Sequence, residues 1–139
     1  MAQAIASINR PAVAHRWRLG AVAVLTVTAV NTLLYAATRA AGIEFKLAEP
    51  GKEAHQLVIW EVLGATLAFA LIGWGTLALL ERVTRRGRVI WAVVAALVLL
   101  VSYGPVLAVE ASTGTKVLLS IFHFTVAAAL FPLLRAPRA

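Results

Sequence analysis

The sequence predicts an all-α integral membrane protein, folded as an up-down-up-down four-helix bundle. The first observation behind this prediction is a set of four long apolar runs, at residues 19–38, 57–80, 89–109 and 117–134. A helix of about 20 residues spans a hydrocarbon core of ~30 Å, so each run can cross a bilayer. The second is the composition, with 61% hydrophobic and 14% charged residues, which is outside the usual balance of soluble domains. The third is the shortness of the connections, which makes consecutive helices antiparallel neighbours.

The segment ahead of the first run, residues 1–18, is basic and is predicted to be a cytoplasmic tail. Basic residues before an apolar run are also found in a cleaved signal peptide. The run at residues 19–38 is longer than the ~7–15 residues of a signal-peptide core, and Asn31 interrupts it. We therefore expect this run to be retained as the first transmembrane helix.

The first two connections differ in length and character. Residues 39–56 contain Gly42, Pro50 and Gly51 among alternating charges, which predicts a solvated loop outside the membrane. Residues 81–88 are few and basic, which predicts a tight turn. Both connections allow the helices that they join to pack side by side.

The third connection, residues 110–116, is predicted to be a tight turn around Gly114. Pro105 and Pro132 lie inside the last two apolar runs. Each proline removes a backbone hydrogen bond, so each favours a kink in its helix. Residues 135–139 form a short C-terminal segment, predicted to be cytoplasmic.

The Lys and Arg residues are distributed unevenly between the two sides of the predicted bundle. One side carries nine of them, namely Arg10, Arg16, Arg18, Arg82, Arg85, Arg86, Arg88, Arg135 and Arg138. The other side carries Arg39, Lys46, Lys52 and Lys116, together with four glutamates. Because cytoplasmic loops are enriched in Lys and Arg, both termini are predicted to be cytoplasmic and the membrane to be the cell's inner membrane. The net charge of +7 then reflects topology and attraction to anionic membrane lipids, and no nucleic-acid partner is predicted.

Tryptophans fall near both predicted boundaries of the membrane. Trp17, Trp74 and Trp91 lie near the inner boundary, and Trp60 lies near the outer one. Aromatic belts at the interface have this distribution, so the tryptophans agree with the predicted spans.

Each predicted helix carries a polar side chain in the outer half of the bilayer. These are Asn31 and Tyr35 in the first run, Glu61 in the second, Tyr103 next to Ser102 in the third, and His123 in the fourth. At ~1.5 Å per residue they lie roughly 6–12 Å below the outer boundary. Charged side chains in hydrocarbon are costly, so Glu61 is not expected to face lipid while ionised. We predict that Asn31, Tyr35, Glu61, Tyr103 and His123 line a polar ligand recess that opens to the outer side.

Each of these residues also has a purely structural interpretation. Glu61 is close enough to the boundary to be a rim carboxylate in contact with water. His123 and Asn31 are each suited to hydrogen bonding between helices, which is worth about 0.6–2 kcal/mol in membranes. Tyr35 and Tyr103 are compatible with deep positions in the aromatic belt. The sequence does not choose between these roles and a recess.

The composition excludes several kinds of chemistry. The chain contains no cysteine, so disulfides, thiol catalysis and thiolate metal sites are ruled out. His55 and His123 lie on the outer side but at levels that differ by roughly 10 Å, which makes them a poor ligand pair. We therefore predict no metal site and no cofactor.

Two classes of function are compatible with these residues. The first is a non-enzymatic role, in which the protein binds or moves a small or lipophilic molecule in the recess, or serves as an accessory membrane subunit. The alternative is a membrane-embedded enzyme that acts on a lipid-soluble substrate, with Glu61 and His123 as acid and base. The sequence leaves open a homo-oligomer or a membrane-protein partner.

Short motifs along the chain resemble one family. They are the Asn in the first run, Gly73-Trp74-Gly75 followed by Leu80-Glu81-Arg82, the segment Arg88 to Trp91, Pro105, and the last run ending in Leu133-Leu134-Arg135. In this order they resemble a family of small bacterial four-helix integral membrane proteins of unknown function. The resemblance covers most of the chain and implies a four-helix fold without implying a mechanism.

Overall fold

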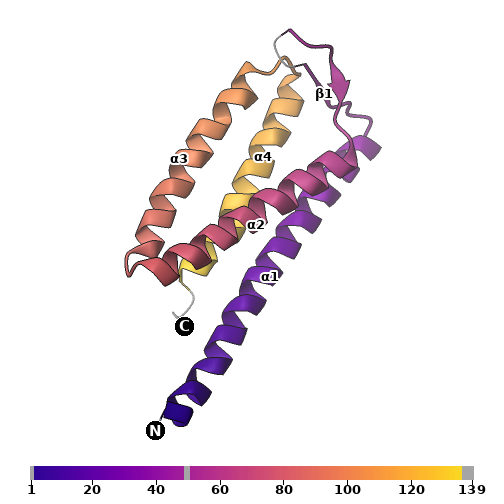
Figure 1. The fold of residues 1–139 in the computed structure, drawn as a ribbon. Coiled ribbons are helices and arrows are strands. Elements are labelled where there is room, and N and C mark those ends of the chain that lie inside the picture. The colour runs from indigo at the N-terminus through magenta and orange to yellow at the C-terminus, as the bar shows by residue number, and fades with distance from the viewer. Residues whose placement is uncertain (1, 49–50, 136–139) are drawn as a thin grey trace.

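The computed structural model describes residues 2–48 and 51–135, with side chains from residue 14 onward. Within these residues, four α-helices follow one another as α1 (Ala2–Ala40), α2 (Ile59–Val83), α3 (Gly87–Ala108) and α4 (Thr113–Leu130) (Figure 1). Each contributes to a helical segment of at least 22 residues that is long and apolar enough to cross a membrane, and for α4 this segment runs on to Leu134. The predicted fold class is confirmed. Helix α1 begins at Ala2, so its backbone continues through most of the basic segment 1–18.

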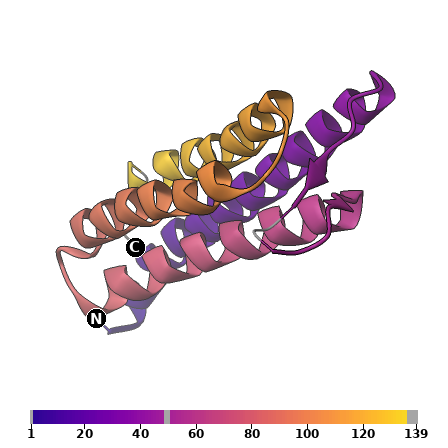
Figure 2. The ribbon, with the colours of Figure 1, turned by 90° about the horizontal axis from the view of Figure 1, so that it is seen from above.

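The helices pack as two pairs that face each other. Seen from above, α3 and α4 lie on one side of the bundle, and α1 and α2 lie on the other (Figure 2). Close packing between helices in lipid depends on small residues, and Gly20 of α1 shows this, because an added Cβ would collide with the Trp74 ring of α2. In the middle of the bundle, Val24, Val27 and Ala70 form a buried cluster between α1 and α2.

The tryptophans differ in exposure, and one of them does not lie in an interfacial belt. Trp60 is 74% exposed and Trp17 51% exposed, as interfacial residues would be. Trp91 is only 5% exposed, and its indole Nε1 donates a hydrogen bond of 2.8 Å to the Gly73 carbonyl of α2. The assignment of Trp91 to a belt is therefore corrected: an indole N–H that finds a carbonyl on the neighbouring helix is stable in the interior.

The connection between α1 and α2 is folded over the bundle. Strands β1 (Lys46–Leu47) and β2 (His55–Gln56) pair antiparallel, and Ala48 exchanges two backbone hydrogen bonds with Glu110 at the α3–α4 connection. Phe45 is buried among residues of α1, α2 and α4. Most described residues of this connection are exposed, as the predicted solvated loop requires. Phe45 is the exception, because its aromatic side chain gains more from burial than from exposure to water.

The two ends of α4 also differ from the predicted turn and kink. The helix begins at Thr113, so Gly114 lies within its first turn, and the Ser112 side chain accepts a hydrogen bond from the Thr115 backbone N–H. At the other end, α4 is followed by a 3-10 helix, η1 (Phe131–Leu134), whose second residue is Pro132. The proline thus coincides with the end of α4, where its missing N–H costs least.

Candidate functional site

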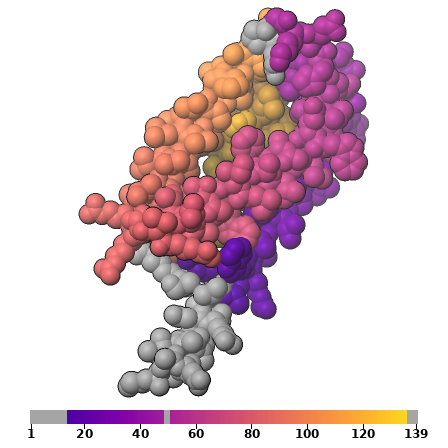
Figure 3. Space-filling model, in the orientation of Figure 1, coloured from indigo at the N-terminus to yellow at the C-terminus, as the bar shows by residue number. Residues whose placement is uncertain are grey.

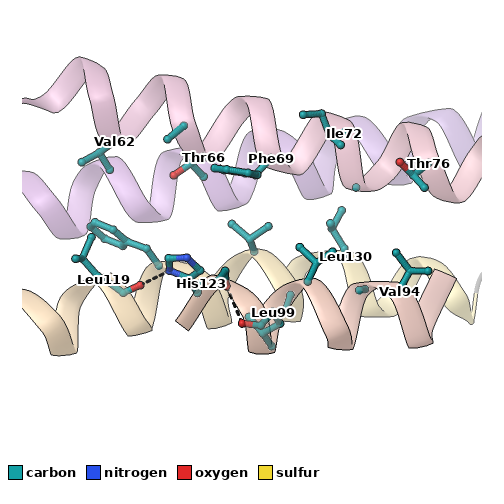
Figure 4. Close-up of a pocket in the computed structure, with 18 of the residues that line it drawn as sticks. Val62, Thr66, Phe69, Ile72, Thr76, Val94, Leu99, Leu119, His123 and Leu130 are labelled. Atoms are coloured by element: carbon teal, nitrogen blue, oxygen red, sulfur yellow. Dashed lines mark hydrogen bonds between the residues drawn. The ribbon is translucent and has the colours of Figure 1, made fainter. Parts of the chain in front are cut away.

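A groove with a cavity volume of about 330 Å³ lies between α2 and α3 and has α4 as its floor (Figure 3). Three helices line it. Helix α2 contributes Glu61, Val62, Thr66, Phe69, Ile72 and Thr76. Helix α3 contributes Trp91, Val94, Leu99 and Ser102, and α4 contributes Leu119, Phe122, His123 and Leu130. Figure 4 shows side chains from the three helices turned toward the shared space. We call this space the groove.

The groove exists because α2 and α3 are held together at one end only. At their shared turn Gly87 packs on the backbone of Leu80, so closely that an added Cβ would lie 2.5 Å from the Leu80 carbonyl carbon. The bond from Trp91 to Gly73 adds a second attachment one turn farther along α3. Beyond these contacts the two ribbons diverge (Figure 1), and α3 is the least buried of the spanning segments in the described structure.

His123 lies in the lining of the groove, on α4. Its ring Nδ1 lies 2.7 Å from the Leu119 carbonyl oxygen, one turn earlier in the same helix (Figure 4). The ring also contacts Tyr103 of α3, with ring centroids 6.0 Å apart. The hydroxyl of Tyr103 is buried and has no hydrogen-bond partner among the described residues. Tyr103 is thus beside His123 but is not part of the groove lining.

Glu61 lies at the end of the groove nearest the α1–α2 connection, in the first turn of α2. Its Oε2 accepts a hydrogen bond of 2.8 Å from the Val58 backbone N–H, which is one of the unpaired donors at the start of the helix. Its Oε1 is 3.6 Å from His55 Nε2, and both side chains are about half exposed. Among the described residues, neither a hydrogen bond nor an ion pair joins Glu61 to His123.

Asn31 is fully buried where α1, α2 and α4 meet. Its Nδ2 donates to Thr66 Oγ1 at 3.2 Å and to the Phe122 carbonyl at 3.5 Å, and its Oδ1 accepts from Thr125 Oγ1 at 2.6 Å. All these partners belong to other helices, so the amide is satisfied within the bundle. Asn31 therefore binds helices together behind the groove and does not line it.

Tyr35 is likewise buried outside the groove. Its ring packs on Phe45, with centroids 5.4 Å apart, and its hydroxyl donates to the Leu57 carbonyl just before α2. The structure therefore separates the five residues of the predicted recess. It brings Glu61 and His123 to one groove, places Tyr103 next to His123, and packs Asn31 and Tyr35 into the core.

Sequence reasoning missed Glu81, which lies at the other end of the α2–α3 pair. The Glu81 carboxylate accepts hydrogen bonds from Arg16 of α1 and from Arg88 Nε of α3, the latter at 2.6 Å. Arg88 also donates to the Leu134 carbonyl of η1 at 2.8 Å. We call Arg16, Glu81 and Arg88 the Glu81 clamp. The sequence does contain a sign of this role, because Glu81 is the one acidic residue on the side to which nine basic residues were assigned.

Neither the groove nor the clamp offers a ligand set for a metal ion. Within the described residues, no group of three or more His, Cys, Asp or Glu side chains is placed to hold one. The groove instead offers space between apolar side chains, with a few polar groups that include Glu61, Ser102 and His123. Its chemistry is that of a site that contacts a molecule mainly through dispersion forces.

Residues 11–139 match a family of unknown function, DUF6069, and the chain belongs to this family. This result confirms the resemblance to a family of unknown function that the short motifs indicated. A search of the curated proteins and of the solved structures found no significant match.

Proposed function

We propose that this protein binds a lipophilic molecule in the groove, taking it from the surrounding membrane. The observation that carries this proposal is the groove itself: about 330 Å³ of space between two helices that are each apolar enough to span a membrane. Pockets for small ligands have volumes of ~300–1,000 Å³ and are lined mostly by apolar side chains. An opening between two spanning helices gives access from the lipid without passage through water.

Packing energetics support an occupied groove. A gap between helices leaves its lining without dispersion contacts on one side, and helix association in lipid depends on such contacts because the hydrophobic effect contributes little there. An apolar chain that enters the groove restores the contacts. Phe69, Ile72 and Val94 would contact such a chain along its length.

The orientation of the protein is part of this proposal. The excess of Lys and Arg in residues 1–18, 81–88 and 135–139 supports cytoplasmic termini in an inner membrane, with Glu61 toward the opposite side. Because the chain has no cysteine, single cysteines at Ala54 and Ala136 can be labelled with an impermeant reagent in intact cells. Labelling at Ala54 with protection at Ala136 is expected, and the reverse would overturn the orientation.

Blocking the groove tests the binding proposal. Ala65 of α2 lines the groove, whereas Ala68 of the same helix is exposed and does not. Ala65→Trp fills the space and is expected to lower severalfold the amount of lipophilic molecule retained by the purified protein, measured by mass spectrometry. Ala68→Trp is the matched control and should leave that amount unchanged. Equal retention in the two variants would contradict the proposal and favour an accessory-subunit role.

A second candidate is a membrane-embedded enzyme that uses Glu61 and His123 as acid and base on a lipid-soluble substrate. The supporting observation is that both side chains line the same groove. Their separate hydrogen bonds, to Val58 and to Leu119, give this candidate second place. Glu61→Gln and His123→Gln remove titration while keeping size. Chemical conversion of a bound lipid by the wild-type protein, absent in both variants, would move this candidate to first place.

A further inference from the structure

The polar groups that line the groove are concentrated at its outer end. Glu61, Ser102 and His123 lie there, on three different helices. The inner part is lined by apolar side chains with Thr76 as the one hydroxyl, and it ends at Trp91 and Leu130. This arrangement matches a molecule with a polar head and an apolar tail, oriented with its head outward.

The hydrogen bond of His123 determines what its ring can offer to a ligand. The Leu119 carbonyl oxygen can only accept, so the proton of the 2.7 Å bond belongs to Nδ1. In the neutral imidazole, Nε2 then carries a lone pair and no hydrogen. His123 therefore presents a hydrogen-bond acceptor to a ligand.

Ser102 and Glu61 also offer acceptors to a ligand. The Ser102 hydroxyl donates its hydrogen to the Leu99 carbonyl at 2.7 Å, which leaves only oxygen lone pairs for a ligand. An ionised Glu61 carboxylate has no hydrogen to donate. Thr66 lies across from His123 (Figure 4), and its oxygen accepts the bond from Asn31. The Thr66 side chain keeps its hydroxyl hydrogen but is buried. Among the described residues that line the groove, none is Lys or Arg, so no permanently cationic group is available to pair with a carboxylate or a phosphate.

We propose that the ligand is an amphiphile with a long alkyl chain and a head that donates hydrogen bonds, a hydroxyl or an ammonium group, held at the outer end by His123 and Ser102 near Glu61. This inference rests on the proposed binding function and names the class of ligand. Along α2 the lining from Glu61 to Thr76 extends for roughly 22 Å at ~1.5 Å per residue, which is room for an extended chain. Anionic heads are disfavoured, because they would face acceptors and a carboxylate.

Trp91 provides the means to test this proposal, because it lies at the inner end of the groove, where the tail would end. Replacing Trp17, Trp60 and Trp74 by Phe leaves Trp91 as the one tryptophan in the chain. Hexadecanol, hexadecylamine and hexadecanoate, each with a bromine on the terminal carbon, differ only in the head. Bromine near the indole quenches its fluorescence, so a titration in detergent at neutral pH measures both binding and orientation.

The alcohol and the amine are expected to quench Trp91 fluorescence at about tenfold lower concentration than the carboxylate. A carboxylate head has no hydrogen to donate, so it would leave the acceptors of the site unpaired and bind more weakly. Equal or stronger quenching by hexadecanoate would overturn the choice of head while leaving the groove as a binding site. An absence of quenching by all three would instead overturn the proposed binding function.

Two pairs of variants identify the residues that bind the head group of the ligand. Ser102→Ala is expected to weaken binding of the alcohol severalfold, whereas Ser120→Ala should not, because Ser120 makes the same kind of bond within its helix, to Lys116, but lies outside the groove lining. His123→Leu should remove most of the preference for the alcohol over the carboxylate, and His123→Gln, which retains an acceptor, should restore part of it. Unchanged head preference in both Ser102→Ala and His123→Leu would overturn the assigned contacts.

Discussion

The two ends of the α2–α3 pair are held in different ways. At the basic end, Gly87 lies against the backbone of Leu80, Trp91 bonds to Gly73, and the Glu81 clamp ties α1, α2 and α3 together. At the other end, α2 is bound to α1 and α4 through Asn31, while α3 diverges and the groove opens. A helix that is strongly attached at one end can leave space at the other without separating from the bundle.

The comparison also shows how polar residues are used in the two regions. At the basic end they pair with each other, and Glu81 is only 9% exposed. Behind the groove, Asn31 and Thr66 pair with each other, but His123 and Ser102 are satisfied only by carbonyls of their own helices. Side chains that bond within one helix do not hold two helices together, so they remain available at the surface of the groove. The following variants test this difference, in order of expected effect.

Loss of the Glu81 clamp should have the largest effect. Glu81→Ala leaves Arg16 and Arg88 partly buried without the carboxylate that they share, and breaking such a pair from one side costs about 3 kcal/mol. We expect a clear fall in the unfolding temperature of the purified protein in detergent. Glu44→Ala is the control, since its ion pair with Lys46 is exposed, and it should leave that temperature nearly unchanged. Equal effects of the two variants would mean that the clamp does not hold the helices.

Forcing α2 and α3 apart at their shared turn should have the next largest effect on stability. Gly87→Ala places a methyl group against the Leu80 backbone, which cannot move as a flexible side chain would, and overpacking of this kind costs about 2 kcal/mol. Gly75→Ala is the matched control, because nothing lies within 4 Å of the added Cβ. Thermal unfolding of both variants measures the difference. If Gly87→Ala unfolds at the wild-type temperature, close packing at this turn is not what holds α3.

Replacement of Asn31 should have a smaller effect. Asn31→Leu removes the bonds to Thr66 and Thr125, and interhelical hydrogen bonds in membranes contribute about 0.6–2 kcal/mol. Thr26→Val on the exposed face of α1 is the control and should be neutral. Because Asn31 lies outside the groove lining, Asn31→Leu should leave the head preference measured by Trp91 quenching intact. A lost preference would place Asn31 in the site after all.

Several features of the protein could be predicted from the sequence because they depend on consecutive residues. The four spans follow from hydropathy averaged over whole helices, so local errors of a few residues, such as the start of α2 at Ile59, do not change the result. Antiparallel packing follows from the short connections. Glu61 and His123 could be named as candidates because ionisable groups within apolar runs are rare and costly.

Which polar residues face the groove depends on how the helices pack in three dimensions. Asn31 and His123 both lie well inside their helices, but helix rotation turns one toward its neighbours and the other toward the groove. The Glu81 clamp joins residues 65 positions apart in the chain, and Phe45 enters the core through a connection that looks polar in sequence. Rotations, crossing angles and contacts between distant segments depend on how the helices pack together, and hydropathy and spacing within one segment carry no information about them.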